Sequence, residues 1–274
     1  MSVAAPERRV PSERRGQSSA RRAAALPFPV VLALQFAILG GFVGVWQWAA
    51  DSGRIDTVIF GSPSGVWESF LVYLPSDPAH ESMIATGMAV LLSFVIGSIL
   101  GTAAGLVLGL GRNTDAIFGP FMGPLNSVPR IALAPVFVAW FGLTMSAKVV
   151  LAVTVVFFIL AENARSAVRS VEPDVMTMAR VVGLRGPALL WKVVLPSAVP
   201  SLFANLRLAF TFSLLGVVAS EMIAATSGLG TDIVRYSTSY RIDTVYAILV
   251  IIAVVSVMVN MLFVRIERRL LRWQ

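Results

Sequence analysis

Few residues of this 274-residue chain have side chains that could carry out chemistry. The sequence contains no cysteine and a single histidine, His80, which lies among polar residues with no second candidate ligand near it. Disulfide bonds and thiol chemistry are therefore excluded, and a metal centre is not indicated. The apolar stretches contain no paired carboxylates, so a membrane-embedded enzyme lacks its catalytic groups.

Three polar groups instead interrupt strongly apolar stretches: Asn126, Arg130 and Glu221. An ionisable residue at membrane depth marks a transport pathway by default, so we predict that these side chains line a translocation pathway. Structural alternatives remain open. Arg130 would pair with a carboxylate to fix helix packing, and Glu221 would pair with Arg130 or Arg235. For Glu221 we favour the structural pair.

Residues 175–200 lie between two apolar segments and are not themselves apolar enough to span a membrane. Glycines and prolines divide this stretch into two expected short helices, 175–182 and 187–195. These helices carry bulky apolar residues that a loop in water would not normally expose: Val175, Met178, Val182, Leu190, Trp191 and Val194. Such a surface suggests a docking site for another protein.

The elements that must position these residues are membrane helices. The chain is 57% hydrophobic and only 14% charged, which no soluble domain of this length needs. Several segments exceed the roughly 18 apolar residues that indicate a membrane helix. We therefore predict an all-α integral membrane protein with six spans, at residues 28–50, 84–110, 117–141, 147–162, 201–225 and 245–264, and with a loop at 164–200.

Two of these spans have distinctive patterns. In the second, glycines recur every four residues and form one helical face, which lets another helix approach closely; they are Gly97, Gly101, Gly105 and Gly109. The third should be broken, because prolines and polar groups at membrane depth require protein or a water-filled cavity to satisfy the backbone. Its prolines are Pro120, Pro124, Pro129 and Pro135.

The ends and the orientation follow from charge. Residues 1–27 carry six arginines among small polar residues and are expected to be a disordered cytoplasmic tail. A signal peptide is the alternative, but the apolar run from residue 28 is too long for one. Sixteen basic residues fall on the side of both termini and of the 164–200 loop, against four on the other side. The positive-inside rule places that first side in the cytoplasm, so the net charge of +7 reflects topology and indicates no nucleic-acid partner.

The 164–200 loop also carries a resemblance. Thr177-Met178-Ala179, Gly183 and Val193-x-Leu195-Pro196 match the spacing of the EAA loop, E-A-A-x3-G-x9-I-x-L-P, of the permease subunits of bacterial ABC importers. Threonine replaces the glutamate of that motif, methionine its first alanine and valine its isoleucine. The resemblance implies that the loop forms a coupling helix in a groove of an ATPase subunit, with Leu184 and Arg185 beside the glycine.

A second resemblance narrows the family. Residues 126–142, NSVPRIALAPVFVAWFG, look like the corresponding stretch of the nitrate/sulfonate/taurine branch of these permeases. The likeness extends over roughly residues 30–272, so residues 28–274 form the expected permease domain.

The resemblance implies a function, partners and a location. The chain would be a permease of the bacterial cytoplasmic membrane, importing a small solute such as a sulfonate, taurine or nitrate. ATP and Mg would be bound by a partner ATPase dimer, and the chain itself would hold no cofactor. A second permease copy, as a homodimer rather than a heterodimer, and an extracytoplasmic solute-binding protein would complete the complex within membrane lipid. The alternative is a secondary transporter driven by an ion gradient.

Overall fold

The computed structural model describes residues 27–270, and these fold into helices joined by short turns, with no strand among them. By their internal contacts the residues form two units, one up to Val45 and one from Trp46 onward. The first unit contains most of α1 (Phe28–Asp51). This helix is exposed along almost its whole length, as expected for a helix that faces lipid.

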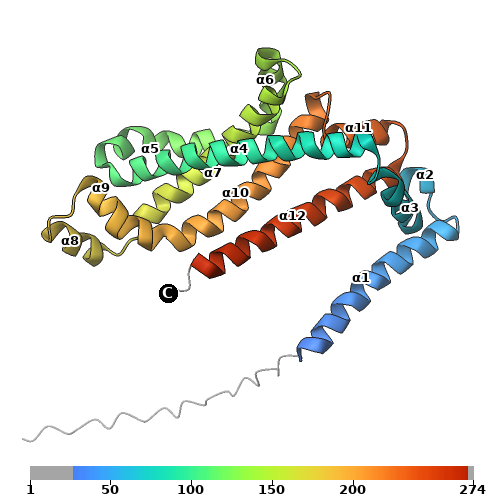
Figure 1. Cartoon of the computed structure of the whole chain (residues 1–274), viewed down its shortest axis with the longest axis horizontal. Helices are drawn as coiled ribbons and strands as arrows, with labels where there is room; N and C mark the ends of the chain where they lie inside the picture. Colours follow the sequence, from blue (N-terminus) through green and yellow to red (C-terminus); the bar gives the residue numbers. More distant parts are fainter. Residues whose placement is uncertain (1–26, 271–274) are drawn as a thin grey trace, which may run out of the picture. The chain divides into compact units, whose positions relative to one another are not determined.

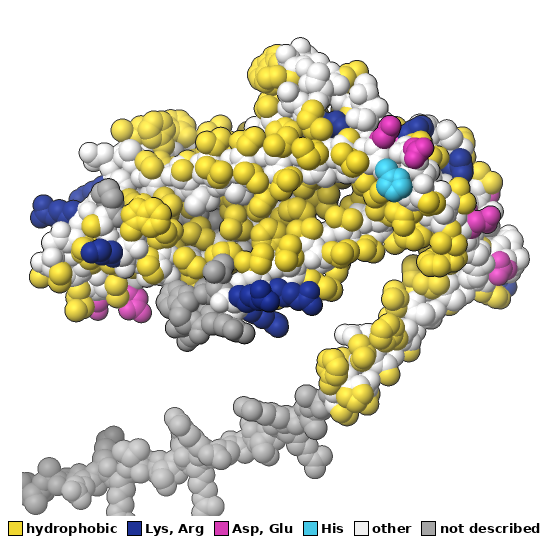
Figure 2. All heavy atoms as spheres, in the orientation of Figure 1, with side chains coloured by type: hydrophobic (Ala, Val, Ile, Leu, Met, Phe, Trp, Pro, Cys, Tyr) yellow, Lys and Arg dark blue, Asp and Glu magenta, His cyan; other side chains and the backbone are white. Residues whose placement is uncertain are grey.

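The second unit contains the remaining candidate spans. They are α4 (Asp77–Leu110), α7 (Met145–Arg169), α10 (Leu195–Ala224) and α12 (Ile242–Leu270), together with a bent pair, α5 (Arg112–Asn126) followed by η1 (Arg130–Leu133) and α6 (Ala134–Phe141). Counting the bent pair as one span, the described chain has up to six. The all-α fold with six spans is therefore confirmed. Figure 2 shows apolar side chains over much of this unit, with charged ones towards its two ends and at the end of α12.

The third span is broken, as its prolines predict. The two halves are bent by 84°. Pro120 and Pro124 are accommodated inside α5, whereas Pro129 precedes η1 and Pro135 lies in the first turn of α6. Because Pro129 lacks an N–H and disfavours helical geometry at Val128, α5 cannot continue past this point.

The glycine stripe of α4 packs on α7, the most extensive helix contact in the chain. A Cβ atom at Gly101 would lie 2.5 Å from the carbonyl oxygen of Phe157, and one at Gly105 would lie 2.2 Å from that of Ala161. Any side chain there would collide with the backbone of the neighbouring helix. The close approach predicted from the spacing is confirmed.

Short helices lie at the two ends of this unit (Figure 1). At one end are α2 (Thr57–Phe60), α3 (Pro63–Tyr73) and α11 (Leu229–Thr238). At the other are α8 (Pro173–Val181), α9 (Gly186–Leu189) and the π-helical turn η2 (Leu190–Val194). We call these the α11 end and the α8 end.

Several helix boundaries differ from the expected ones. α7 continues to Arg169 instead of ending near residue 162, because Arg165 pairs with Glu162 along the helix at 3.3 Å rather than turning the chain. α10 begins at Leu195, not near Ser201. Pro196 lies in its first turn, where a missing N–H is tolerated, and Pro200 is accommodated inside it. The expected 164–200 loop therefore begins within α7 and ends within α10.

Two further starts come earlier than expected. α4 begins at Asp77 instead of residue 84, because the Ser76 hydroxyl accepts from the Ala79 N–H and Pro78 occupies the first turn. α12 begins at Ile242 instead of residue 245. The expected tail, residues 1–27, lies almost entirely outside the described residues.

Candidate functional site

The α8 segment owes its shape to two residue types at its ends. Pro173 occupies the first position of the helix, where its missing N–H costs nothing. Gly183 ends the helix in a left-handed conformation, with φ of +88°. The Gly183 N–H donates to the Arg180 carbonyl at 3.0 Å, and the Leu184 N–H donates to the Ala179 carbonyl at 2.9 Å. These two bonds form a Schellman cap, for which glycine is strongly preferred.

The predicted coupling residues divide into three groups. The first group faces inward. Ala179 is buried in a cluster with Val168, Leu189 and Val194, and Leu184 and Val193 pack against the same cluster. Leu195 packs on a second cluster formed by α7 and α10. These contacts hold the α8 segment on the ends of α4 and α7.

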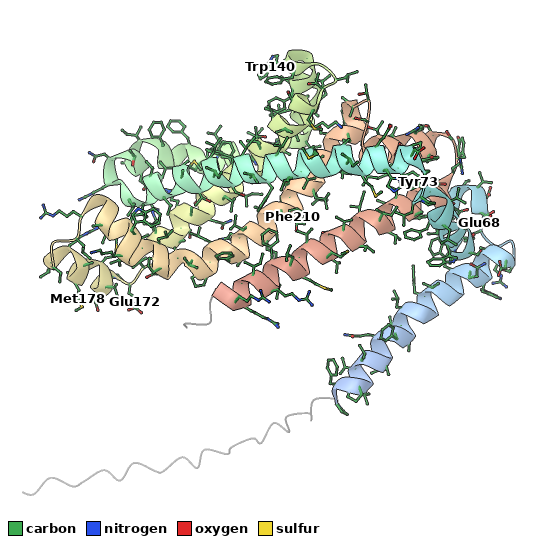
Figure 3. All side chains as sticks on the ribbon, viewed as in Figure 1. Glu68, Tyr73, Trp140, Glu172, Met178 and Phe210 are labelled. Carbon is green, nitrogen blue, oxygen red and sulfur yellow. The ribbon has the colours of Figure 1, made fainter. Side chains whose placement is uncertain are left out.

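The second group faces away from the rest of the molecule. Met178 is 69% exposed, and its neighbours Val181 and Val182 are 82% and 79% exposed; Figure 3 shows Met178 at the tip of the α8 end. Trp191 of η2 is 67% exposed. We call these four residues the α8 surface.

The remaining coupling residues flank the α8 surface. Thr177 and Arg185 are also exposed. The Thr177 hydroxyl donates to the Pro173 carbonyl at 2.8 Å. Threonine places no charge at this position, where the EAA motif has glutamate. The α8 surface is therefore an exposed apolar patch beside two exposed arginines, Arg180 and Arg185, and exposed apolar patches rimmed by polar residues are typical of interaction sites.

Asn126 and Arg130 come together at the break of the third span. The Arg130 guanidinium donates to the Leu125 carbonyl at 2.6 Å and to the Asn126 side-chain oxygen at 3.3 Å. It also lies over the ring of Phe158, 4.5 Å from the centroid. Within residues 27–270, no carboxylate lies within ion-pair distance of it. Among the described residues, main-chain and amide oxygens at the helix break bind the guanidinium in place of the carboxylate of the structural alternative.

Glu221 forms a buried ion pair, but with neither of the expected partners. Its Oε1 lies 3.1 Å from Nζ of Lys148, and both side chains are almost completely buried. Arg235 pairs with Asp232 instead. Sequence reasoning missed Lys148 because the residue stands at the start of a span and was counted only among the four basic residues on the outer side. The two partners are 73 residues apart, and the one available signal was a lysine at the edge of an apolar span.

A second ion cluster, also not predicted, joins α5 to α7 near the α8 end. Asp115 accepts from Nε of Arg165 at 2.5 Å and also pairs with Arg169. Both arginines had been assigned to the loop. Since α7 is longer than expected, its last turns carry them alongside the first turn of α5.

The α11 end is fastened by polar contacts. The Tyr73 hydroxyl donates to Oδ2 of Asp232 at 2.6 Å, which joins α3 to α11. Burial, reinforced by neighbouring Tyr236, raises the pKa of Tyr73 to about 12. Asp243 of α12 accepts from the Ser62 N–H at the start of α3 at 2.7 Å. α3, α11 and α12 are therefore connected to one another.

Comparison with known proteins gives consistent matches. Residues 93–272 match the family described as binding-protein-dependent transport system inner membrane component. The chain is 31% identical over 233 residues to the putative aliphatic sulfonates transport permease protein SsuC of Escherichia coli (strain K12), covering 85% of this chain and 89% of that one. It is 26% identical over 252 residues to the taurine transport system permease protein TauC of the same strain, covering 90% and 92%.

A solved structure has the same fold. A chain of the MetNI methionine ABC transporter in inward-facing conformations aligns with a TM-score of 0.63 at 18% identity, covering 77% of this chain and all of that one. The arrangement of helices described above is therefore one that ABC transporter permeases use.

Proposed function

Because the chain belongs to the family of binding-protein-dependent transport system inner membrane components, we propose that its α8 surface receives the motion of a separate ATPase. The chain is the membrane-spanning permease subunit of an ATP-driven ABC importer. Permeases of this family work with an ATPase partner and a binding protein. The family match favours this function over the ion-gradient-driven alternative.

The coupling proposal rests on one observation: the α8 surface is exposed and apolar, and the segment that carries it packs on α4 and α7. α7 ends at Arg169, α8 begins at Pro173, and α9 continues through η2 into α10. Ala179 is buried against Val168 of α7. A displacement of the α8 surface is therefore passed to both α7 and α10, and these helices would rock as rigid bodies to alternate access across the membrane.

ATP and Mg belong to the partner in this proposal. A phosphate-binding loop of the Walker A type needs a Gly-Lys pair. Both lysines of the chain follow other residues, Ala147 and Trp191. In this proposal the partner supplies the ATPase site, and we expect no ATPase site or cofactor in the permease itself.

The solute is proposed to be a small oxyanion, such as a sulfonate, taurine or nitrate. Two relatives are named for aliphatic sulfonates and for taurine. Arg130, held beside Asn126 at the break of the third span, provides positive charge without a carboxylate neighbour among the described residues. Glu221 is enclosed by protein and is proposed to act structurally.

The assembly follows from the same premise. Two copies of the chain would enclose the pathway as a homodimer, since one set of six spans rarely does so alone. Both termini and the α8 end would lie in the cytoplasm, following the distribution of basic residues. The α11 end would then face the solute-binding protein.

A charge placed on the α8 surface tests the coupling role. Val181→Glu should reduce the amount of ATPase subunit that co-purifies with the permease by about tenfold, because a charge in an interface core costs at least about 1.4 kcal/mol. The matched control is Val72→Glu, at a site on α3 at the α11 end that is 65% exposed. Equal recovery of the ATPase with both variants would contradict the assignment.

Arg130→Ala tests the solute class. If the arginine binds an anion, the variant should lose uptake of taurine, whereas Arg130→Lys, which retains the charge, should keep part of it. Uptake unchanged in Arg130→Ala would exclude Arg130 from the pathway.

A further inference from the structure

The Lys148–Glu221 pair lies at the meeting point of three spans. Lys148 stands in the first turn of α7, Glu221 in the last turn of α10, and Thr86 in α4. The Thr86 hydroxyl lies 3.0 and 2.9 Å from the two carboxylate oxygens of Glu221. All three side chains are almost completely buried. We call this cluster the latch. In the part of the chain that the structure describes, it contains the one ion pair in which both side chains are almost completely buried.

The latch also holds the loop that begins α11. The Gly230 N–H donates to Oε2 of Glu221 at 3.0 Å, the Leu229 N–H donates to the Thr86 hydroxyl at 2.8 Å, and Lys148 donates to the Ser227 carbonyl. The first N–H groups of a helix have no partner within the helix and favour negative charge. Glu221 and Thr86 therefore cap α11 from other helices.

The glycines of this loop are required by the close fit. Gly228 has φ of +122°, and a Cβ atom there would lie 2.1 Å from Oε1 of Glu221. A Cβ at Gly230 would lie 2.4 Å from the carbonyl oxygen of Val218. The loop can therefore wrap the carboxylate only because both positions lack side chains.

From the latch, a continuous series of contacts runs to the α11 end and to the α8 end of the second unit. On one side, Asp232 of α11 accepts from Tyr73, so α3 is joined to α11. On the other side, Lys148 belongs to α7, a helix that continues to Arg169 and is followed directly by α8. Rigid elements joined by such bonds are the physical means by which distant sites are coupled.

We propose that the Lys148–Glu221 latch transmits displacement of α11 to α7, and so carries the signal of the docked solute-binding protein to the α8 surface. The inference rests on the proposed function, since it assumes that the binding protein acts on the α11 end and the ATPase on the α8 end. Lys148, Glu221 and Thr86 act as positioning residues, because all three are enclosed by protein and bond to the loop and first turn of α11.

The test uses the double variant Lys148→Met/Glu221→Gln in the whole complex. Removing one charge would leave the other buried and unpaired, and could prevent folding. Removing both leaves no orphan charge, so the complex should assemble, while the ion pair and the bond from Lys148 to the Ser227 carbonyl are lost. Ser213→Ala is the control, because Ser213 makes a buried contact from α10 to Ser93 of α4, at 2.7 Å, that does not reach α11.

Two readouts separate the inference from its premise. The first is ATP hydrolysis with and without the solute-binding protein. In the double variant the basal rate should stay within about twofold of wild type, and stimulation by the binding protein should be lost. Ser213→Ala should keep it. Stimulation of the double variant equal to that of wild type would overturn the proposal.

The second readout needs no ATPase. Ile233 of α11 is buried, and the chain has no cysteine, so Ile233→Cys provides a unique thiol. A membrane-impermeant maleimide should label this thiol at least about tenfold faster in the double variant than in the Ile233→Cys protein alone, because α11 is no longer held in place. Equal labelling rates would overturn the proposal for the latch, whether or not an ATPase binds to the chain. Failure of the chain to bind an ATPase would instead contradict the proposed function.

Discussion

Replacing two glycines of α4 by alanine should destabilise the protein strongly, although alanine is the better helix former. At Gly101 and Gly105 the new Cβ atoms would meet carbonyl oxygens of α7 at 2.5 and 2.2 Å. Each substitution gains about 1 kcal/mol of helix propensity. Overpacking costs about 3 kcal/mol, the upper end of the usual range, because a backbone carbonyl cannot rotate away as a side chain does.

The net cost is therefore about 2 kcal/mol per site, or about 4 kcal/mol for Gly101→Ala/Gly105→Ala, which corresponds to a change on the order of a thousandfold in the folding equilibrium. The matched control lies on the same helix. A Cβ at Gly87 meets nothing within 4 Å, so Gly87→Ala should gain up to about 1 kcal/mol.

Thermal unfolding in detergent measures the difference. At about 2–4 °C per kcal/mol, the double variant should unfold roughly 10 °C below wild type, and Gly87→Ala slightly above it. A double variant as stable as Gly87→Ala would refute the argument, because it would mean that α4 and α7 are not in backbone contact.

Three further perturbations have defined outcomes. Tyr73→Phe should cost about 1.5–3 kcal/mol of stability by removing the hydrogen bond to Asp232. Because burial raises the pKa of Tyr73 to about 12, the stability that its hydroxyl contributes should be fully present below about pH 10 and lost as pH rises through 12. Tyrosinate absorbance and the midpoint of unfolding should therefore change over the same pH range. Gly183→Ala should cost about 1–2 kcal/mol, since alanine resists the left-handed conformation that ends α8, and should weaken ATPase recovery in a pull-down without changing membrane insertion. Asp115→Asn should lower the unfolding midpoint, because Arg165 loses the nearer of its two carboxylate partners and keeps only Glu162 at 3.3 Å. Arg169→Gln alone should not reproduce this change, because Arg169 is half exposed.

The features predictable from the sequence are those set by nearby residues. Apolar length indicated the membrane helices. The spacing from Gly97 to Gly109 indicated a close helix contact, and the four prolines of the third span indicated that it is broken. Gly183 could be placed at a helix end because the left-handed conformation of that residue depends on its own lack of a side chain. Each of these depends on a few neighbouring residues and on the geometry of a single helix.

The features that were missed depend on residues distant in sequence. Lys148 and Glu221 are 73 positions apart, and nothing near either residue identifies the other. The charged last turns of α7 resembled a loop, because nothing near Arg165 in the sequence indicates that it pairs with Asp115 of α5. The early start of α10 depends on Pro196 and Pro200 being tolerated by the helix that surrounds them.

Site-specific cross-linking from the α8 surface tests the central claim most directly. With no native cysteine in the chain, Met178→Cys provides one reactive position at the α8 end, and Val72→Cys provides one at the α11 end. We predict that a short thiol cross-linker joins the ATPase subunit to the first and not to the second. A cross-link from Val72→Cys, or none from Met178→Cys in a complex that contains the ATPase, would contradict the account.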